Sequence, residues 1–153
     1  DESGPTTDRP QLDAHKPRAE HVLVVDDEAD IRETLAQILT EEGYNVRTAG
    51  DGVEALVKAL RSSVLPDLML LDIGLPYVTG LEVAAALDAV MQERGLPPIP
   101  RLYITAADPN RLGPEVRRDF VFTKPLKLEE LLEEAHARIN EGRLLRLSRK
   151  VTP

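Results

Sequence analysis

The sequence predicts an α/β fold, in which a doubly wound, five-stranded parallel sheet carries helices on both faces. From residue 21 onward, short apolar runs alternate with segments whose apolar residues recur every three or four positions. This alternation is typical of βαβ units. The run Leu68–Leu71 is uniformly apolar, as expected of a central strand buried on both faces, whereas Tyr44–Thr48 alternates and is expected nearer a sheet edge.

Five strands and five helical segments are expected along the chain. The strands are expected at Val22–Val25, Tyr44–Thr48, Leu68–Leu71, Arg101–Ile104 and Phe120–Phe122. The regular helices are expected at about Asp30–Glu42, Gly52–Ser62, Leu81–Arg94 and Leu128–Glu141. Gly43 and Gly142 are expected to end the first and the last of these helices. The remaining segment, Asp108–Asp119, holds two prolines and a glycine, so any helix there is expected to be short, kinked or late in starting.

Three segments are predicted along the 153 residues. Residues 1–20 are polar and hold three prolines, which is typical of a flexible leader or linker. Residues 21–141 are predicted to form a single domain. Residues 142–153 are expected to be a basic tail or linker, because they carry four basic residues and no acidic one.

Composition argues against several classes of function. With a net charge of −8 and a pI near 4.9, the chain is not expected to bind nucleic acid or an anionic membrane surface. No apolar stretch approaches the roughly 20 residues that span a bilayer. The absence of cysteine excludes disulfides and thiolate metal sites and makes the cytoplasm the default compartment. The three histidines are too scattered for a metal set, and His136 is expected on a solvated helix face.

Four of the predicted strands end at polar residues. Asp26 and Asp27 follow the first strand, Asp72 follows the third, Thr105 follows the fourth and Lys124 comes just after the fifth. The carboxyl ends of parallel strands share one edge of a sheet, and open α/β sheets bind their ligands at that edge. These five residues are therefore expected to meet in one crevice.

The expected crevice is suited to a divalent cation. Three carboxylates repel one another, at a cost of about 4 kcal/mol per pair at roughly 4 Å and an effective dielectric constant near about 20. Such a site must protonate one group or bind a cation, and oxygen-only ligands favour Mg²⁺. The simpler alternative, in which the first two aspartates only cap the following helix, leaves Asp72, Thr105 and Lys124 at the same edge unexplained.

Asp72 is the candidate phosphoacceptor, because a carboxylate nucleophile can form an aspartyl phosphate. The loop after it is expected to bend away and to leave the Gly74 carbonyl as a further ligand for a hard cation. Phosphoryl transfer depends mainly on positioning and charge neutralisation. Thr105 is therefore expected to supply a hydroxyl donor, and Lys124 a cation, to the phosphoryl oxygens.

Together these residues resemble the receiver domains of two-component response regulators. The matching positions are Asp26-Asp27, Asp72 with Pro76 and Gly80, Thr105-Ala106 and Lys124-Pro125. The resemblance covers about residues 21–141 and implies a flavodoxin-like sheet of order 2-1-3-4-5. It also implies that a histidine kinase or phosphotransfer protein phosphorylates Asp72, with Mg²⁺ held by Asp27, Asp72 and the Gly74 carbonyl, and with Asp26 assisting. On this interpretation the chain is a switch and not an enzyme, with self-catalysed phosphorylation and dephosphorylation at most.

Two features depart from the family pattern. Three residues before the lysine, where such receivers often carry an aromatic ring that rotates on activation, this chain has Val121. The expected switch region is therefore Val121 with Ala106 and Ala107, without a ring movement. In the family, the fourth helix, the fifth strand and the fifth helix form the face that binds a downstream protein, and the same face is expected to do so here. In this chain a Pro/Gly-rich segment stands in place of a robust fourth helix. Output is expected to rely on reordering of Asp108–Arg118.

Two other functions are weighed against the switch. A Mg²⁺-dependent aspartyl-phosphate phosphatase resembling haloacid dehalogenases would require Asp-x-Asp after its first strand, which neither Asp26–Ala29 nor Asp72–Gly74 supplies. A receiver-like binding module that is never phosphorylated is disfavoured by the complete acidic set.

Overall fold

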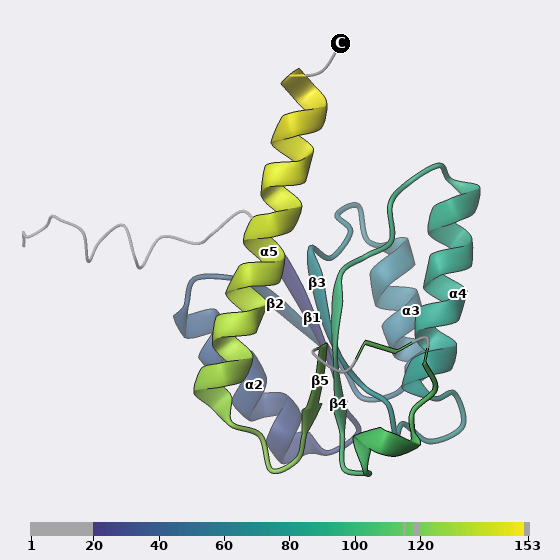
Figure 1. The fold of residues 1–153 in the computed structure, drawn as a ribbon, viewed down its shortest axis with the longest axis vertical. Helices are drawn as coiled ribbons and strands as arrows, with labels where there is room; N and C mark the ends of the chain where they lie inside the picture. The colour runs from purple at the N-terminus through teal and green to yellow at the C-terminus, as the bar shows by residue number, and fades with distance from the viewer. Residues whose placement is uncertain (1–19, 115, 118–119, 152–153) are drawn as a thin grey trace, which may run out of the picture.

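The structure is a computed structural model that describes residues 20–114, 116–117 and 120–151 (Figure 1). Five parallel strands form one sheet in the order β2-β1-β3-β4-β5. The strands are β1 (His21–Val25), β2 (Asn45–Ala49), β3 (Leu68–Asp72), β4 (Arg101–Thr105) and β5 (Val121–Thr123). The helices are α2 (Ala29–Glu41), α3 (Gly52–Arg61), α4 (Gly80–Glu93) and α5 (Leu128–Val151), with a short 3₁₀ helix η1 (Pro109–Arg111). The predicted fold class and strand order are confirmed.

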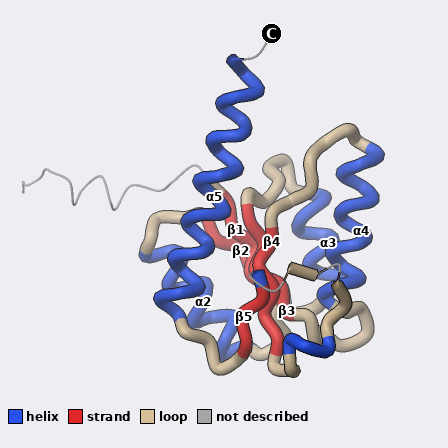
Figure 2. Tube along the Cα trace, in the orientation of Figure 1, coloured by secondary structure: helices blue, strands red, loops and turns tan. Residues whose placement is uncertain are grey.

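The sheet is the middle of three layers, with α2 and α5 on one face and α3 and α4 on the other (Figure 2). Alternate residues of the central strands point to opposite layers, as the period of two in a strand requires. Leu23 and Leu71 pack towards α3 and α4, whereas Val24 and Leu70 pack towards α2 and α5. All five residues of β3 are buried, which confirms the predicted central strand, and β2 lies at the sheet edge as predicted.

Two strands, β2 and β5, both begin and end one residue later than predicted. At β2 the reason is the end of the preceding helix, because Tyr44 N–H still donates to the Leu39 carbonyl at 3.2 Å. Gly43, with a φ of 96°, turns the chain between them, so the predicted helix stop at this glycine is confirmed. Strand β5 begins at Val121 instead of Phe120.

The predicted end of the last helix at Gly142 is wrong. Helix α5 continues for another nine residues to Val151 and projects past the sheet (Figure 1). A glycine inside a helix costs only about 1 kcal/mol relative to alanine, and the leucines and arginines that follow are good helix formers. The described part of the expected basic tail is therefore helical, and Arg143 Nη1 pairs with the buried Glu20 at 3.2 Å. Residues 1–19 of the expected leader, and residues 152–153, lie outside the described residues.

The described part of the connection from β4 to β5 contains the 3₁₀ turn η1 and no α-helix, where receivers were expected to have a fourth helix. Asp108 begins this turn, and its side chain accepts a hydrogen bond from Asn110 N–H at 2.9 Å. The expectation of only a short helix in this segment is confirmed for the described residues. Residues 115, 118 and 119, which belong to the same expected segment, lie outside them.

The expectation of a solvated His136 is wrong. Its Nδ1 is hydrogen-bonded to the hydroxyl of the buried Tyr44, and its Nε2 lies 3.1 Å from a carboxylate oxygen of Glu42. The histidine thus joins α5 to the connection between α2 and β2. The sequence spacing of 92 residues between the two rings gives no local sign of this contact.

Within the described part of the chain, every helix is too short or too polar to span a bilayer.

Candidate functional site

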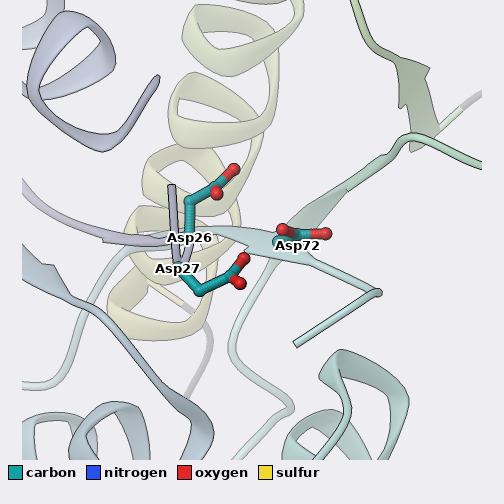
Figure 3. A group of neighbouring side chains, drawn as sticks. All are labelled: Asp26, Asp27 and Asp72. Carbon is teal, nitrogen blue, oxygen red and sulfur yellow. The ribbon is translucent and has the colours of Figure 1, made fainter. Parts of the chain in front are cut away.

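The predicted carboxylates meet at the carboxyl edge of the sheet. Strands β1 and β3 are direct neighbours, with Val25 opposite Leu71, so the residues that end them lie side by side. One oxygen each from Asp26, Asp27 and Asp72 can be chosen such that all three lie within 4.8 Å of one another (Figure 3). Asp26 and Asp72 are buried, whereas Asp27 is exposed, so the cluster opens to solvent on one side.

Local hydrogen bonds hold the two buried carboxylates in place. Asp26 Oδ1 accepts from the Glu28 N–H at 2.8 Å, and Asp72 Oδ1 accepts from the Gly74 N–H at 2.9 Å. Each is a side chain bonded to the backbone two residues later, an arrangement that aspartate favours. The second oxygen of Asp26 is buried and has no hydrogen bond of regular geometry, and its partner is the ammonium group of Lys124 at 3.1 Å. A buried carboxylate oxygen needs a positive charge or a hydrogen bond beside it, so this position suits a cation.

Lys124 brings a positive charge to the cluster from the other end of the sheet. Its Nζ lies 3.1 Å from Asp26 Oδ2 and 3.3 Å from Asp72 Oδ2, and it also contacts Glu28 Oε1. The backbone ties it to the end of β4, because Lys124 N–H donates to the Thr105 carbonyl at 2.8 Å. Burial opposes the charged form, but hydrogen bonds to Glu28 and Asp26 and the charge of Asp72 outweigh it and raise the pKa of Lys124. The residue is therefore a permanent cation.

The environment of Asp72 disfavours its ionised form. Burial is the largest cause and raises the pKa of Asp72, and the negative charge of Asp26 acts in the same direction. The Gly74 N–H and Lys124 oppose the shift without cancelling it. Repulsion between the carboxylates was expected from the sequence, and in the structure the positive charge of Lys124 beside Asp26 and Asp72 offsets part of it.

The loop after Asp72 ends at Gly80, where the backbone packs against the backbone of Asp72. A Cβ atom on Gly80 would lie 2.2 Å from the Asp72 carbonyl oxygen, so only glycine fits there. Ile73 N–H donates to the Ile104 carbonyl at 2.8 Å, and Gly80 N–H donates to the Ile73 carbonyl at 3.0 Å. These bonds tie the loop back to β4 and to the start of α4. Between them Tyr77 has a φ of 67° and is 99% exposed.

The other predicted residues border the cluster. Thr105 is buried at the end of β4, and its Oγ1 accepts from the Ala107 N–H at 3.0 Å. Ala106 and Ala107 are exposed. Val121 is half-buried on β5, in register with Tyr103 of β4. The structure thus brings together the side chains of Asp26, Asp27, Asp72 and Lys124. Thr105 lies beside them, and its carbonyl accepts the Lys124 N–H.

Sequence reasoning missed Glu28, which is one of the three carboxylates on Lys124. The available signal was weak. Glu28 occupies the N-cap position of α2, where serine, threonine, aspartate or asparagine is preferred, and its side chain makes no capping bond. A glutamate in that position can make its contacts elsewhere, but the sequence does not identify Lys124, 96 residues away, as the partner.

The cluster fits Mg²⁺ on its own chemistry. The donors are carboxylate oxygens without sulfur or nitrogen, which is the ligand set of a hard cation. The three oxygens lie within 4.8 Å of one another, which is close enough for one ion to contact all of them. Among the described residues, Asp26, Asp27 and Asp72 are therefore the group that can hold such an ion.

An apolar cavity of ≈ 260 Å³ opens beside Lys124. It lies between the first turns of α2 and the loop that leads into α5. Its lining consists of Asp30, Ile31, Thr34, Leu35, Lys124, Pro125, Leu126 and Leu128.

An open five-stranded parallel sheet with an acidic cluster and a lysine at its carboxyl edge defines a class of phosphoryl-accepting α/β domains. Residues 22–136 match the family described as the response regulator receiver domain. The chain therefore belongs to this family, and it is a receiver domain of two-component response regulators, as the sequence motifs predicted.

Similar proteins agree with this assignment. The response regulator MprA of Mycobacterium ulcerans is 36% identical over 126 residues, which cover 80% of this chain and 51% of MprA. The DNA-binding response regulator MtrA of Mycobacterium tuberculosis is 37% identical over 125 residues, covering 80% of this chain and 52% of MtrA. The chain thus spans about half the length of the curated relatives it matches.

Solved receiver structures have the same fold. The chemotaxis protein CheY4 of Vibrio cholerae superposes with a TM-score of 0.65 at 32% identity, covering 77% of this chain and 97% of CheY4. The response regulator TrrA of Thermotoga maritima, solved in complex with Mg²⁺ and BeF, gives a TM-score of 0.62 at 34% identity, covering 78% of this chain and 98% of TrrA.

Proposed function

We propose that Asp72 accepts the phosphoryl group from a phosphohistidine of a partner histidine kinase or phosphotransfer protein. The observation that supports this most is the buried Asp72 carboxylate, which shares a cluster with Asp26 and Asp27 and lies 3.3 Å from Lys124 Nζ. In the transfer, a carboxylate oxygen of Asp72 bonds to phosphorus. The bond from phosphorus to the donor nitrogen breaks, and the nitrogen keeps the electron pair.

Two side chains are proposed to neutralise and orient the transferred group. Lys124 supplies a permanent positive charge beside Asp72 and would pair with a phosphoryl oxygen. The Thr105 oxygen already accepts a hydrogen bond from Ala107, so its own hydroxyl proton is available to a phosphoryl oxygen.

Mg²⁺ is proposed as the cofactor, held by Asp26, Asp27 and Asp72 with the Gly74 carbonyl. When bound, such an ion offsets negative charge on the carboxylates and on the phosphoryl oxygens. The all-oxygen donor set and the close approach of the three carboxylates support this proposal.

The donor protein is proposed to dock beside Lys124. Any donor must approach the carboxyl edge of the sheet, where the apolar cavity between α2 and the start of α5 adjoins the lysine. An apolar side chain of the donor would fill this cavity while its phosphohistidine reaches Asp72.

The signal is proposed to leave through the face formed by the β4–β5 connection, β5 and α5. Phosphorylation adds about −1.5 to −2 charges. This charge would draw Thr105 and Lys124 towards Asp72 and shift Ala106, Ala107 and Val121. Since Val121 has no ring to rotate, reordering of residues 108–118 is proposed to carry the change to a downstream protein. Amide hydrogen exchange with and without beryllofluoride tests this, and equal protection of the segment in both states would contradict it.

The phosphorylated form is proposed to dephosphorylate itself fairly quickly. Gly74 and Ala107 are small and flank the expected phosphoryl position, which leaves room for an attacking water. Loss of labelled phosphate from the purified chain measures the rate, and a lifetime of many hours would contradict the proposal.

The phosphoacceptor role is tested by incubating the chain with Mg²⁺ and acetyl phosphate and measuring its intact mass. We expect a gain of one phosphate in the wild type and no gain in Asp72→Asn, because the amide is not a nucleophile of this kind. Turnover of diverse phosphoesters would instead indicate a phosphatase. An unchanged mass, also with a histidine-phosphorylated kinase as donor, would indicate a receiver-like binding module.

A further inference from the structure

Glu28 is used differently from the residues that begin the next two helices. Asp51 caps α3 through a hydrogen bond from the Glu54 N–H, and Thr79 forms a capping box with Glu82 at the start of α4. Glu28 holds the same N-cap position at α2, but its side chain makes no capping bond. Its carboxylate contacts Lys124 instead (Glu28 Oε1 to Nζ).

The three carboxylates on Lys124 are not equivalent. Asp26 and Asp72 belong to the cluster that fits a divalent cation, and Glu28 does not. A cation held by Asp26 and Asp72 takes up their oxygens and repels the Lys124 ammonium. Glu28 is then the partner that still attracts the ammonium, because it stands at the rim with its side chain 57% exposed.

We infer that Glu28 is a positioning residue, which keeps the Lys124 ammonium beside Asp72 when the aspartates bind Mg²⁺. The role requires both the charge and the length of the side chain, and length comes first, because a carboxylate at the start of α2 that cannot reach the loop before α5 cannot hold the ammonium. The predicted effect of Glu28 on the phosphorylation rate rests on the function proposed above. The predicted effect of Glu28 on the position of the Lys124 ammonium does not.

The competing explanation is that Glu28 only adds negative charge near the site. The two explanations predict opposite signs for Glu28→Gln. Acetyl phosphate is an anion, so removal of a negative charge alone would speed its reaction with Asp72. Loss of an anchor for Lys124 would slow the reaction, because less positive charge would face the incoming phosphoryl group.

Three variants separate reach from charge. Glu28→Gln keeps the length and a hydrogen-bond acceptor but removes the charge. Glu28→Asp keeps the charge but is one methylene shorter, and it is also a better N-cap. Glu33→Gln is the matched control, because Glu33 is an exposed acid on the same helix and does not line the cavity proposed to receive the donor. The ion pairs of Lys124 in the described structure join it to Asp26, Glu28 and Asp72 and not to Glu33.

The first readout is the rate of phosphorylation by acetyl phosphate with Mg²⁺, followed by intact mass. We expect the order wild type, then Glu28→Gln, then Glu28→Asp, with the last about three- to tenfold slower than wild type, the scale of one partly exposed charge-assisted hydrogen bond. Glu33→Gln is expected within about twofold of wild type. Thermal unfolding midpoints check folding, and Glu28→Asp is expected to unfold no earlier than wild type.

The second readout is the NMR signal of the Lys124 ammonium group, which needs no phosphorylation. On addition of Mg²⁺ alone, the signal is expected to persist in the wild type and to broaden by exchange with water in Glu28→Asp. Equal rates in all four proteins, or a faster Glu28→Gln, would overturn the inference, as would an ammonium signal that is unaffected in Glu28→Asp. Absence of phosphate from every protein, with acetyl phosphate and also with a histidine-phosphorylated kinase as donor, would overturn the proposed function, while the ammonium signal would still decide the role of Glu28.

Discussion

The two sides of β3 are built in different ways. On one side, four of the five residues of β1 are buried, and β1 is followed by a regular helix. On the other side, beyond β4, the edge strand β5 has three residues, none of them buried, and the described part of the connection that leads to it holds no α-helix. The acidic cluster lies on the well-packed side, whereas the proposed output face lies on the lightly packed side. Parts of a protein that move at modest cost are those with few buried contacts, so this division suits a fixed acceptor site next to a responsive surface.

The largest expected effect concerns the loop that follows Asp72. In Gly80→Ala the new methyl group would meet the Asp72 carbonyl at 2.2 Å, so the backbone of the site must shift. We expect a loss of at least about 3 kcal/mol of unfolding free energy, or failure to fold. Gly74→Ala is the control in the same loop, since its methyl group would meet only an Asp72 side-chain oxygen at 3.6 Å. Urea unfolding of both variants measures the difference, and equal losses would show that the loop is not held as described.

The next effect compares the two sides directly. Leu70→Ala removes a fully buried side chain from β3 and is expected to cost about 2–5 kcal/mol, as is usual for such core truncations. Val121→Ala truncates a half-buried residue of β5 and is expected to cost about 1 kcal/mol or less. Chemical denaturation of the two variants provides the test. A larger loss for Val121→Ala would contradict the view that the β5 side is the lightly packed one.

A smaller effect follows from the raised pKa of Asp72. Because the fold favours the protonated carboxyl, ionised Asp72 lowers stability, and this penalty appears as pH rises through the raised pKa. Asp72→Asn is therefore expected to be more stable than wild type at pH 7 in a chelator. The difference is expected to vanish at pH values below the ordinary carboxyl pKa of 3.8. Unfolding midpoints across this pH range check the sign, and a less stable Asp72→Asn at pH 7 would be the opposite result.

The positions of Asp26, Asp27, Asp72 and Lys124 could be predicted because each follows a strand, and parallel strands bring their carboxyl ends to one edge. This argument needs only the apolar runs and the order of polar residues after them. The contact of Glu28 with Lys124 could not be predicted in the same way, because it depends on the length and direction of a side chain in the folded molecule.

The two wrong predictions, the helix end at Gly142 and the solvated His136, both relied on the local sequence alone. Gly142 was expected to end a helix, but a single glycine does not end a helix when the residues after it favour the helical state. His136 was expected in solvent because its neighbours in sequence are charged. Its contacts with Tyr44 and Glu42 come from the packing of α5 against the end of α2, which the local sequence does not encode.

The most direct test of the account is to locate the phosphoryl group at residue level. The chain is phosphorylated with acetyl phosphate and Mg²⁺, reduced with borohydride, which converts an aspartyl phosphate to homoserine, and digested for peptide mass mapping. Homoserine at position 72, and not at positions 26 or 27, is the predicted result. Modification at Asp26 or Asp27, or a phosphorylated chain with an intact Asp72, would contradict the assignment of Asp72 as the acceptor.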